Sequence, residues 1–185
     1  MQEQPNILRV KNFISSYEIA EINEWVESVV NTKMFGPGIS PGHALWDYHD
    51  RLTTRNQSSY LRHPDFILRL SQRVREYVGV SRYPLIKNHG ADGIVISYTK
   101  QNGDVYEHVD PRCLETNALT LRCNIMTQAS KGADLYIAGR RVDIEVGELH
   151  CYLVSEHMHK VTKAESETPR IMLMFGAHVP KGFWE

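Results

Sequence analysis

Apolar residues recur at helical spacing early in the chain. Residues 7–14 (ILRVKNFI) alternate as an opening strand, and Ser15 followed by Glu18 is the residue pair of a capping box. An apolar stripe then continues through about Asn31 at the 3.6-residue period of a helix. Its members are Ile19, Ile22, Trp25, Val26, Val29 and Val30. This pattern predicts a strand followed by an amphipathic helix that packs on another surface.

A second amphipathic helix is predicted from Pro64, which suits a first helical position, to Gly79, which ends it. Its apolar face consists of Phe66, Ile67, Leu70, Val74, Tyr77 and Val78. Residues 35–60 between the helices are rich in glycine, proline and polar residues, so they are predicted to be an irregular loop. Long loops of this kind often carry function.

From residue 92 the pattern changes to short β-branched and apolar runs separated by turns. The predicted strands are GIVISYT (93–99), ALTLRCNIMT (118–127), ADLYIA (133–138), RVDIEV (141–146), ELHCYLV (148–154), HKVTK (159–163) and RIMLMFGAHV (170–179). Helices followed by many short strands predict an α+β domain with a sandwich or jelly-roll sheet. We expect one domain over 1–185, with helical support and the loop in 1–91 and the jelly-roll core in 92–180.

Composition adds little that is specific. The 185 residues suffice for one core, and a net charge of -1 gives no general attraction to nucleic acid. No apolar stretch reaches the length of a membrane span, and the polar N-terminus lacks the core of a signal peptide. The three cysteines are too few and too widely spaced for a disulfide framework. We therefore expect a cytoplasmic protein without membrane or nucleic-acid partners.

The sequence His108-Val109-Asp110 indicates a metal site. Residues two apart on a strand point to the same face, so His108 and Asp110 can bind one ion. A later strand supplies the third ligand, either His159 or His157. We prefer His159, because it starts an inward-facing register with Val161. Two imidazoles and one carboxylate with open positions suit a non-haem Fe(II) oxygenase.

The order HxD, His and Arg170, with the strand GELHCYL between them, resembles the Fe(II)/2-oxoglutarate-dependent dioxygenases, especially the prolyl-hydroxylase-like branch. The resemblance also covers ILRVKNFISSYEIAEI, ISYTKQNGDVYEHVD, KGADLYI and PRIMLMFG. It implies a double-stranded β-helix (jelly roll, cupin-like) core with the N-terminal helices packed on one sheet. It also implies that His108, Asp110 and His159 bind Fe(II) and take part in catalysis.

The same resemblance implies a 2-oxoglutarate site. Arg170 matches the residue that pairs with the distal carboxylate, and its planar guanidinium suits such a pair. Tyr98 matches a tyrosine that often lines the co-substrate pocket, although it equally fits a core aromatic. Asn124 is a weaker candidate for this pocket, as is Arg122.

The implied reaction uses O2 and 2-oxoglutarate to hydroxylate a C–H bond, with release of succinate and CO2. The carboxylate of Asp110 disfavours halogenation. We expect a small-molecule substrate, such as an amino acid or a natural-product intermediate, with a peptidyl side chain as the alternative. Substrate contacts are predicted at Arg112 and, on the 35–60 loop, at Trp46, Arg51 and Arg55.

Two other classes of protein fit the motif less well. A metal-binding β-sandwich without turnover would be expected to lose at least one member of the HxD, His and Arg set. A zinc hydrolase can use two histidines and a carboxylate, but the chain lacks HExxH and gives Arg170 no role there.

Overall fold

The computed structural model describes residues 5–30, 35–37, 42–47, 64–84, 94–113 and 116–184. Helix α1 (Ser16–Val30) begins where the capping box predicts. The Ser15 backbone N–H donates to Glu18 Oε2 at 2.8 Å, and the Glu18 N–H donates to Ser15 Oγ at 3.3 Å. These two bonds satisfy amide groups that the helix itself leaves without partners.

Helix α2 (Asp65–Val78) follows Pro64 and ends at Gly79, whose φ of 78° is left-handed. The Val80 N–H donates to the Arg75 carbonyl, which closes the last turn. Ile67, Leu70 and Val74 are buried on one face of the helix, as predicted. Both predicted helices are therefore confirmed to within a residue of their ends.

Within the described ranges, the strands form two antiparallel sheets. The larger has seven strands in the order β1-β9-β6-β11-β4-β3-β2, and the smaller has four in the order β5-β10-β7-β8. The larger contains β1 (Leu8–Val10), β2 (Phe35–Pro37), β3 (His43–Asp47), β4 (Ile94–Thr99), β6 (Leu119–Gln128), β9 (Leu149–Leu153) and β11 (Arg170–Val179). The smaller contains β5 (Val105–His108), β7 (Leu135–Ile137), β8 (Arg140–Val142) and β10 (His159–Val161).

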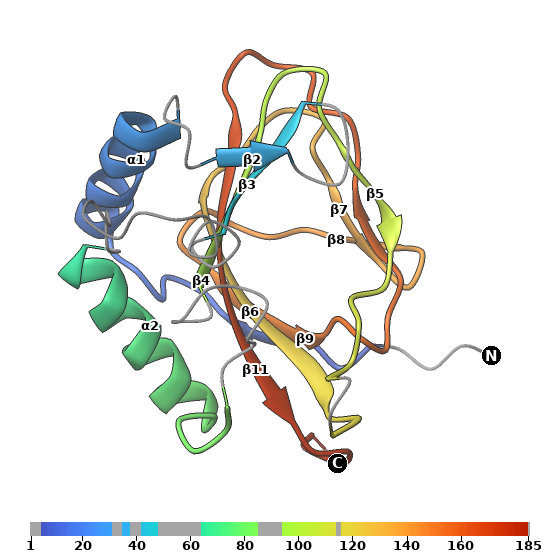
Figure 1. The fold of residues 1–185 in the computed structure, drawn as a ribbon. Helices are drawn as coiled ribbons and strands as arrows, with labels where there is room; N and C mark the ends of the chain where they lie inside the picture. Colours follow the sequence, from blue (N-terminus) through green and yellow to red (C-terminus); the bar gives the residue numbers. More distant parts are fainter. Residues whose placement is uncertain are drawn as a thin grey trace, which may run out of the picture.

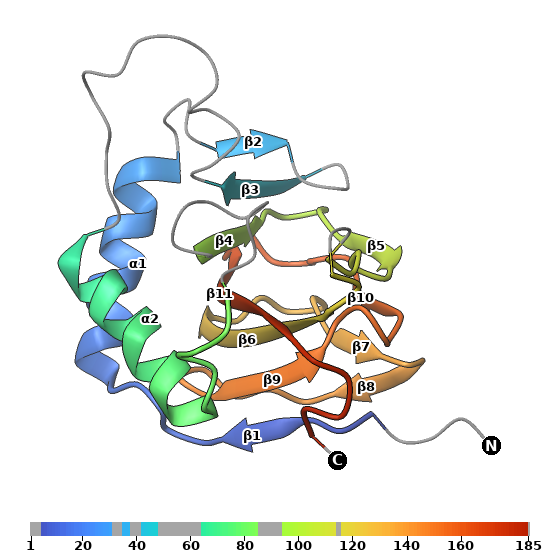
Figure 2. The same cartoon turned by 60° about the horizontal axis from the view of Figure 1, so that its bottom comes forward.

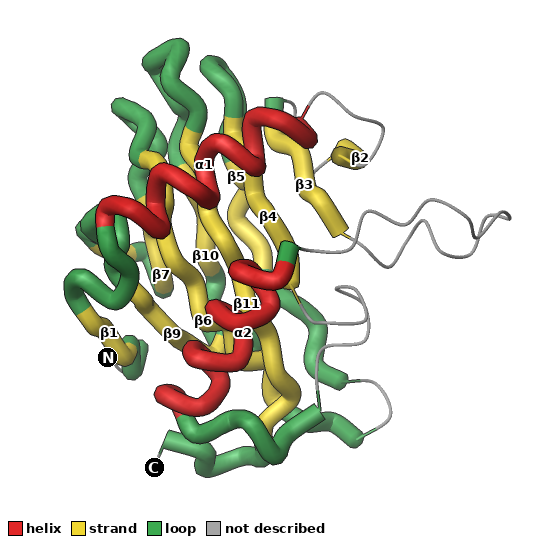
Figure 3. The backbone as a smooth tube through the Cα atoms, turned by 90° about the vertical axis from the view of Figure 1, so that its left-hand side faces the viewer, coloured by secondary structure: helices red, strands yellow, loops and turns green. Residues whose placement is uncertain are grey.

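The elements form three layers. Helices α1 and α2 lie on one face of the larger sheet, and the smaller sheet lies across its other face (Figure 1, Figure 3). Figure 2 shows the strands of the two sheets stacked along the molecule, with the helices to one side. The result is an α+β, jelly-roll-like fold. One face of the larger sheet packs against the helices, and its other face lies opposite the smaller sheet.

Alternation along the four central strands separates the two faces of the larger sheet. The residues facing the helices join one buried cluster, which includes Ile94 and Ile96 of β4, Leu121 and Cys123 of β6, Leu149 and Cys151 of β9, and Ile171 and Leu173 of β11. Their neighbours at the alternate positions point between the sheets. The helices thus cover a continuous apolar face, and the opposite face of the sheet borders the space between the two sheets.

The structure corrects three predicted segments. The opening strand ends at Val10, because Asn12 adopts a left-handed φ of 53°. The run 141–146 is a strand only as far as Val142. Beyond it the Asp143 carbonyl accepts a bond from Arg9, and the Glu145 N–H donates to Glu148 Oε2 at 3.2 Å instead of to a neighbouring strand.

The third correction concerns 35–60, where an irregular loop was predicted. Strands β2 and β3 pair with each other, and β3 also pairs with β4. The described part of 1–91 therefore extends the larger sheet as well as supplying helices. Positions 38–41 and 48–60 of the predicted loop lie outside the described residues. Among the described helices, neither is long and apolar enough to cross a membrane.

Candidate metal centre

A cavity of about 300 Å³ lies between the two sheets. The larger sheet contributes residues from the face opposite the helices, and the smaller sheet and the segment after β5 supply the facing wall. The larger-sheet residues are Val95, Ser97, Arg122, Asn124, His150, Tyr152, Arg170, Met172 and Met174. From the facing wall come His108, Val109, Asp110, Pro111 and His159, among others. Most of the lining is apolar, with the charged groups confined to a few positions.

His108, Asp110 and His159 meet at this cavity. Strands β5 and β10 are antiparallel neighbours in which His108 and His159 are directly paired, so their rings lie 4.2 Å apart between centroids. Asp110 follows two residues after His108, and its backbone N–H donates to the Val154 carbonyl at 3.1 Å. One potential ligand atom from each of the three residues lies within 4.8 Å of the other two.

Both histidines are oriented by the backbone. His108 Nδ1 lies 2.7 Å from the Tyr106 carbonyl, and His159 Nδ1 lies 3.0 Å from the His157 carbonyl. A carbonyl can only accept, so each Nδ1 carries a proton, which leaves each Nε2 as the nitrogen available to a metal ion. Metal-binding histidines are held in this way, with one ring nitrogen anchored and the other directed at the ion.

Of the two histidines considered for the third ligand, the geometry brings His159 to the cluster. The His157 side chain is not among the cavity-lining residues or in the group of potential ligands. Its contribution to the site is its backbone carbonyl, which orients His159. The inward register argued from Val161 is also observed, because Val161 lines the same cavity.

Asp110 divides its two oxygens between the sheets. Oδ1 lies 3.3 Å from His108 Nε2 and 4.0 Å from His159 Nε2. Oδ2 accepts two bonds from Arg122 of β6, from Nε at 3.1 Å and from a terminal nitrogen at 2.9 Å. Burial would raise the pKa of Asp110, but the His108 hydrogen bond and the Arg122 charge outweigh it and hold this pKa well below its usual range. Asp110 is therefore ionised at neutral pH.

Arg170, the first residue of β11, provides a buried positive charge in the same cavity. It is 4% exposed, and burial lowers its pKa to about 10, which still leaves the guanidinium charged at neutral pH. Within the described part of the chain, its guanidinium has no hydrogen-bond or ion-pair partner. A buried charge without a counterion is costly, so this position favours binding of an anion.

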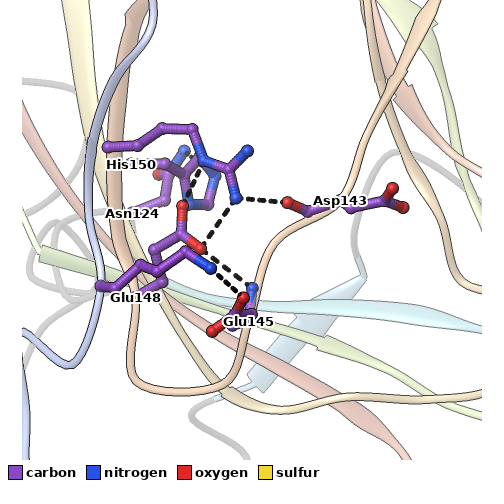
Figure 4. Close-up of polar contacts among 7 residues, drawn as sticks. Asn124, Asp143, Glu145, Glu148 and His150 are labelled. Atoms are coloured by element: carbon purple, nitrogen blue, oxygen red, sulfur yellow. Dashed lines mark hydrogen bonds and ion pairs between the residues drawn. The ribbon is translucent and has the colours of Figure 1, made fainter.

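Asn124 and His150 lie side by side on the cavity wall, from the neighbouring strands β6 and β9. Asn124 Nδ2 is 3.3 Å from His150 Nε2 (Figure 4). Among the described residues, Asn124 Oδ1 and His150 Nδ1 have no hydrogen-bond partner although both atoms are buried. Figure 4 also shows Glu148, a buried carboxylate that accepts bonds from Arg9 and so ties β1 to the start of β9.

His150 should make the metal-free protein sensitive to mild acid. Full burial, together with the charge of Arg170, lowers the pKa of His150 to about 3. In the unfolded chain the group titrates near its ordinary value of about 6.5, so on acidification the unfolded state takes up the proton first. The contribution of His150 to the unfolding free energy is therefore fully present above a pH of about 6.5, and it is lost as the pH falls towards 3.

We expect His150 to account for about 2 kcal/mol of the loss in unfolding free energy between pH 7 and pH 5. Urea unfolding of the metal-free protein at both pH values tests this, with His150→Leu as the comparison. The variant should lose less stability than the wild type by about that amount. Equal losses in the two proteins would contradict the assignment of a buried neutral imidazole.

The interpretation of Tyr98 as a co-substrate residue is wrong. Tyr98 alternates with Ser97 and so lies on the helix-facing side of β4, within the cluster that also contains Ile96. Its hydroxyl donates to Glu27 Oε1 of α1 at 3.4 Å. The alternative interpretation, a core aromatic, is the one observed, whereas Asn124 does face the cavity.

The predicted substrate residues fall into two groups. Arg112 does not line the cavity, and its guanidinium pairs instead with Glu156. Trp46 is on β3, paired in register with Ile96, but its side chain lies outside the described part of the structure. Arg51 and Arg55 also lie outside the described residues.

Two residues of the site received no firm role from the sequence. Arg122 is only a weak pocket candidate in the sequence, and the sequence assigns no role to His150. The signal for both was the strand alternation that places 122, 124, 150 and 152 on one side once the outward face is known. Which side the helices cover could not be decided from these strands alone.

The donor set fits a divalent metal ion of intermediate hardness. Two imidazole nitrogens and one carboxylate oxygen converge without a fourth protein ligand among the described residues. This arrangement leaves adjacent coordination positions for small ligands, as in non-haem Fe(II) sites. The buried cation of Arg170 in the same cavity would complement an anionic ligand bound there.

No protein-family profile and no curated protein matches this sequence. Solved structures do match. A prolyl-4-hydroxylase from Pseudomonas putida is 13% identical, with a TM-score of 0.64 over 97% of this chain and 95% of that one. A Trichoplax adhaerens prolyl hydroxylase, in complex with a hypoxia inducible factor oxygen degradation domain peptide fragment, is 13% identical, with a TM-score of 0.68 over 95% and 84%.

A third structure is HygX from Streptomyces hygroscopicus, with nickel, 2-oxoglutarate and hygromycin B bound. It is 11% identical, with a TM-score of 0.66 over 96% of this chain and 84% of that one. A 2OG-Fe(II) oxygenase family protein from Burkholderia pseudomallei also matches. The chain therefore has the fold of the prolyl hydroxylases and other 2-oxoglutarate/Fe(II) oxygenases, which confirms at the level of the fold the resemblance found in its sequence.

Proposed function

We propose that the protein is an Fe(II)/2-oxoglutarate-dependent oxygenase that hydroxylates a C–H bond. The observation that carries this proposal is the content of one cavity. It holds three residues that could together bind a metal ion. It also holds the buried cation of Arg170, which has no counterion in the described part of the chain. A metal site with open positions next to an unpaired cation is what an α-keto acid with a distal carboxylate requires.

In this proposal His108, Asp110 and His159 hold the iron, and Arg170 binds the distal carboxylate. Asn124 lies on the same wall and can turn its amide to donate to the co-substrate, with His150 as its partner. Iron with 2-oxoglutarate and O2 supplies the chemistry, in which decarboxylation to succinate and CO2 is coupled to transfer of oxygen to the substrate. The protein's part is to orient these groups and exclude water, to which the apolar walls contribute.

Two finer features belong to the same proposal. In it the two facing sheets form a double-stranded β-helix, and the residues that would hold the iron lie at or just beyond one end of β5 and β10. The carboxylate of Asp110 supports oxygen transfer over halide transfer, because a halide would need the iron position that this carboxylate occupies and that a small residue at 110 would leave free. Both features agree with the resemblance to the prolyl-hydroxylase-like branch.

For the substrate we propose a small molecule, such as an amino acid or a natural-product intermediate. HygX, which shares this fold, was solved with hygromycin B, and this supports a small-molecule substrate. The alternative is a peptidyl side chain, supported by the peptide bound to the Trichoplax adhaerens prolyl hydroxylase. A screen that detects a gain of one oxygen by mass spectrometry, run on metabolite extracts and on peptide pools, distinguishes the two.

Anaerobic reconstitution tests the proposed chemistry directly. Addition of Fe(II) and then 2-oxoglutarate to the metal-free protein should produce the weak visible charge-transfer band of the chelate, and a chelator should abolish it. Admission of air should then yield succinate, at a higher rate when the true substrate is present. The proposal fails if no band forms and no succinate appears with any substrate pool.

A further inference from the structure

We propose that Arg122 is a positioning residue that restricts Asp110 to binding the metal through a single oxygen. The inference rests on the proposed metal site and adds a residue to it. Arg122 itself is not a ligand, because a guanidinium has donors only. It would act through the carboxylate, by keeping one of its two oxygens away from the ion.

The contacts of Asp110 carry this inference. Both Arg122 bonds, at 3.1 and 2.9 Å, go to Oδ2, while Oδ1 is the oxygen near both histidine Nε2 atoms. A carboxylate whose Oδ2 accepts two charge-assisted bonds cannot rotate to present that oxygen to an ion without breaking them. The two oxygens of Asp110 thus have different partners in the structure.

Arg122 is well placed to impose this restriction. Its side chain is only 6% exposed, and it projects from β6, which pairs with β9 on one side and β11 on the other. In register, Arg122 lies opposite Tyr152 of β9 and Gly176 of β11. The histidines belong to the smaller sheet and Arg122 to the larger one, so Asp110 is held from both sides of the cavity.

The number of open positions is what this restraint would protect. Two imidazoles and one carboxylate oxygen leave three positions on a six-coordinate ion. A co-substrate that binds through two atoms fills two of them and leaves one for O2. If Asp110 bound through both oxygens, only two positions would remain, and the co-substrate and O2 would compete for them.

Loss of Arg122 has two opposing effects on the metal itself. The carboxylate loses its orienting partner, and removal of such a partner typically weakens metal binding by about 10- to 100-fold. The site also loses a positive charge that opposes a cation, and the freed Oδ2 can become an additional donor. Metal affinity should therefore change little, whereas co-substrate affinity should fall because a coordination position is lost.

The test uses Arg122→Met with Co(II) and 2-oxoglutarate as the probes, followed by calorimetry. We expect the Kd for Co(II) to stay within about tenfold of the wild-type value, since the two effects offset each other. The Kd for 2-oxoglutarate binding to the Co(II)-loaded protein should rise at least tenfold. Arg140→Met is the matched control, because Arg140 is an exposed residue of β8 that does not line the cavity.

Each other outcome overturns the inference. If the variant loses Co(II) and 2-oxoglutarate together, Arg122 only supports the ligand structurally. If neither Kd changes, the carboxylate needs no restraint. Arg122→Lys retains the charge and a donor and keeps the test decisive should the methionine variant not fold. It should give an intermediate rise in the 2-oxoglutarate Kd, and an unchanged value there also refutes the proposal. A wild-type protein that fails to bind Co(II) refutes the metal site itself, which is a separate result.

Discussion

Replacement of Arg170 by methionine should abolish most co-substrate binding and at the same time stabilise the metal-free protein. The first effect follows because removal of one partner from a buried charge pair costs about 2–5 kcal/mol, or at least about 30-fold in the Kd for 2-oxoglutarate. The second follows because the metal-free fold carries a buried cation whose counterion is not among the described residues. An apolar side chain of similar length removes that cost.

Calorimetry with 2-oxoglutarate and thermal unfolding without it measure the two effects separately. For a chain of this size each kcal/mol of stabilisation raises the Tm by about 2–4 °C. The control is Arg140→Met, which removes an exposed arginine of β8 and should change neither quantity. A variant that binds 2-oxoglutarate as tightly as the wild type would show that Arg170 does not hold the co-substrate.

His159→Ala should lose metal binding almost entirely, whereas His157→Ala should retain it. Of these two residues, His159 is the one that directs its Nε2 at the carboxylate of Asp110, at 4.0 Å. His157 takes part through its backbone carbonyl, which alanine also supplies. Loss of a direct ligand should exceed the penalty of about 10- to 100-fold that follows loss of an orienting partner.

Titration with Co(II), followed by its visible absorption, compares the two variants under identical conditions. The neighbouring positions and equal change in side chain make His157→Ala a close control for His159→Ala. If His157→Ala also lost the metal, the register of β10 described above would be wrong. A variant at His108 should behave like His159→Ala, because the two residues are directly paired on adjacent strands.

The sequence predicted the helices well because their signals are local. The bonds between Ser15 and Glu18, and the left-handed Gly79 after α2, depend on residues within one turn of the chain. The β2–β3 hairpin was missed for the opposite reason. Its strands are short, β2 contains Gly36 and Pro37, and the place of β3 in the sheet depends on pairing with β4, far away in sequence.

The proposed metal ligands were predictable because His108 and Asp110 are only two residues apart in the sequence, although Asp110 lies just beyond the end of β5, and because His159 starts a short strand with Val161. Arg122 and Tyr98 were harder, because their roles depend on which face of a strand the helices cover. Tyr98 points to α1 and Arg122 points away from it, a difference that neither local sequence states. The order of the motifs indicated the proposed reaction, whereas the packing determines which side chains face the cavity.

The separation of the two faces of the larger sheet allows the binding specificity to change without loss of the fold. Val95, Met172 and Met174 line the cavity, whereas their chain neighbours Ile96, Ile171 and Leu173 hold the helices. A library restricted to the first three positions would sample new substrates on an unaltered scaffold. The same partition offers a physical reason why chains of such low sequence identity can retain one architecture while their binding cavities diverge.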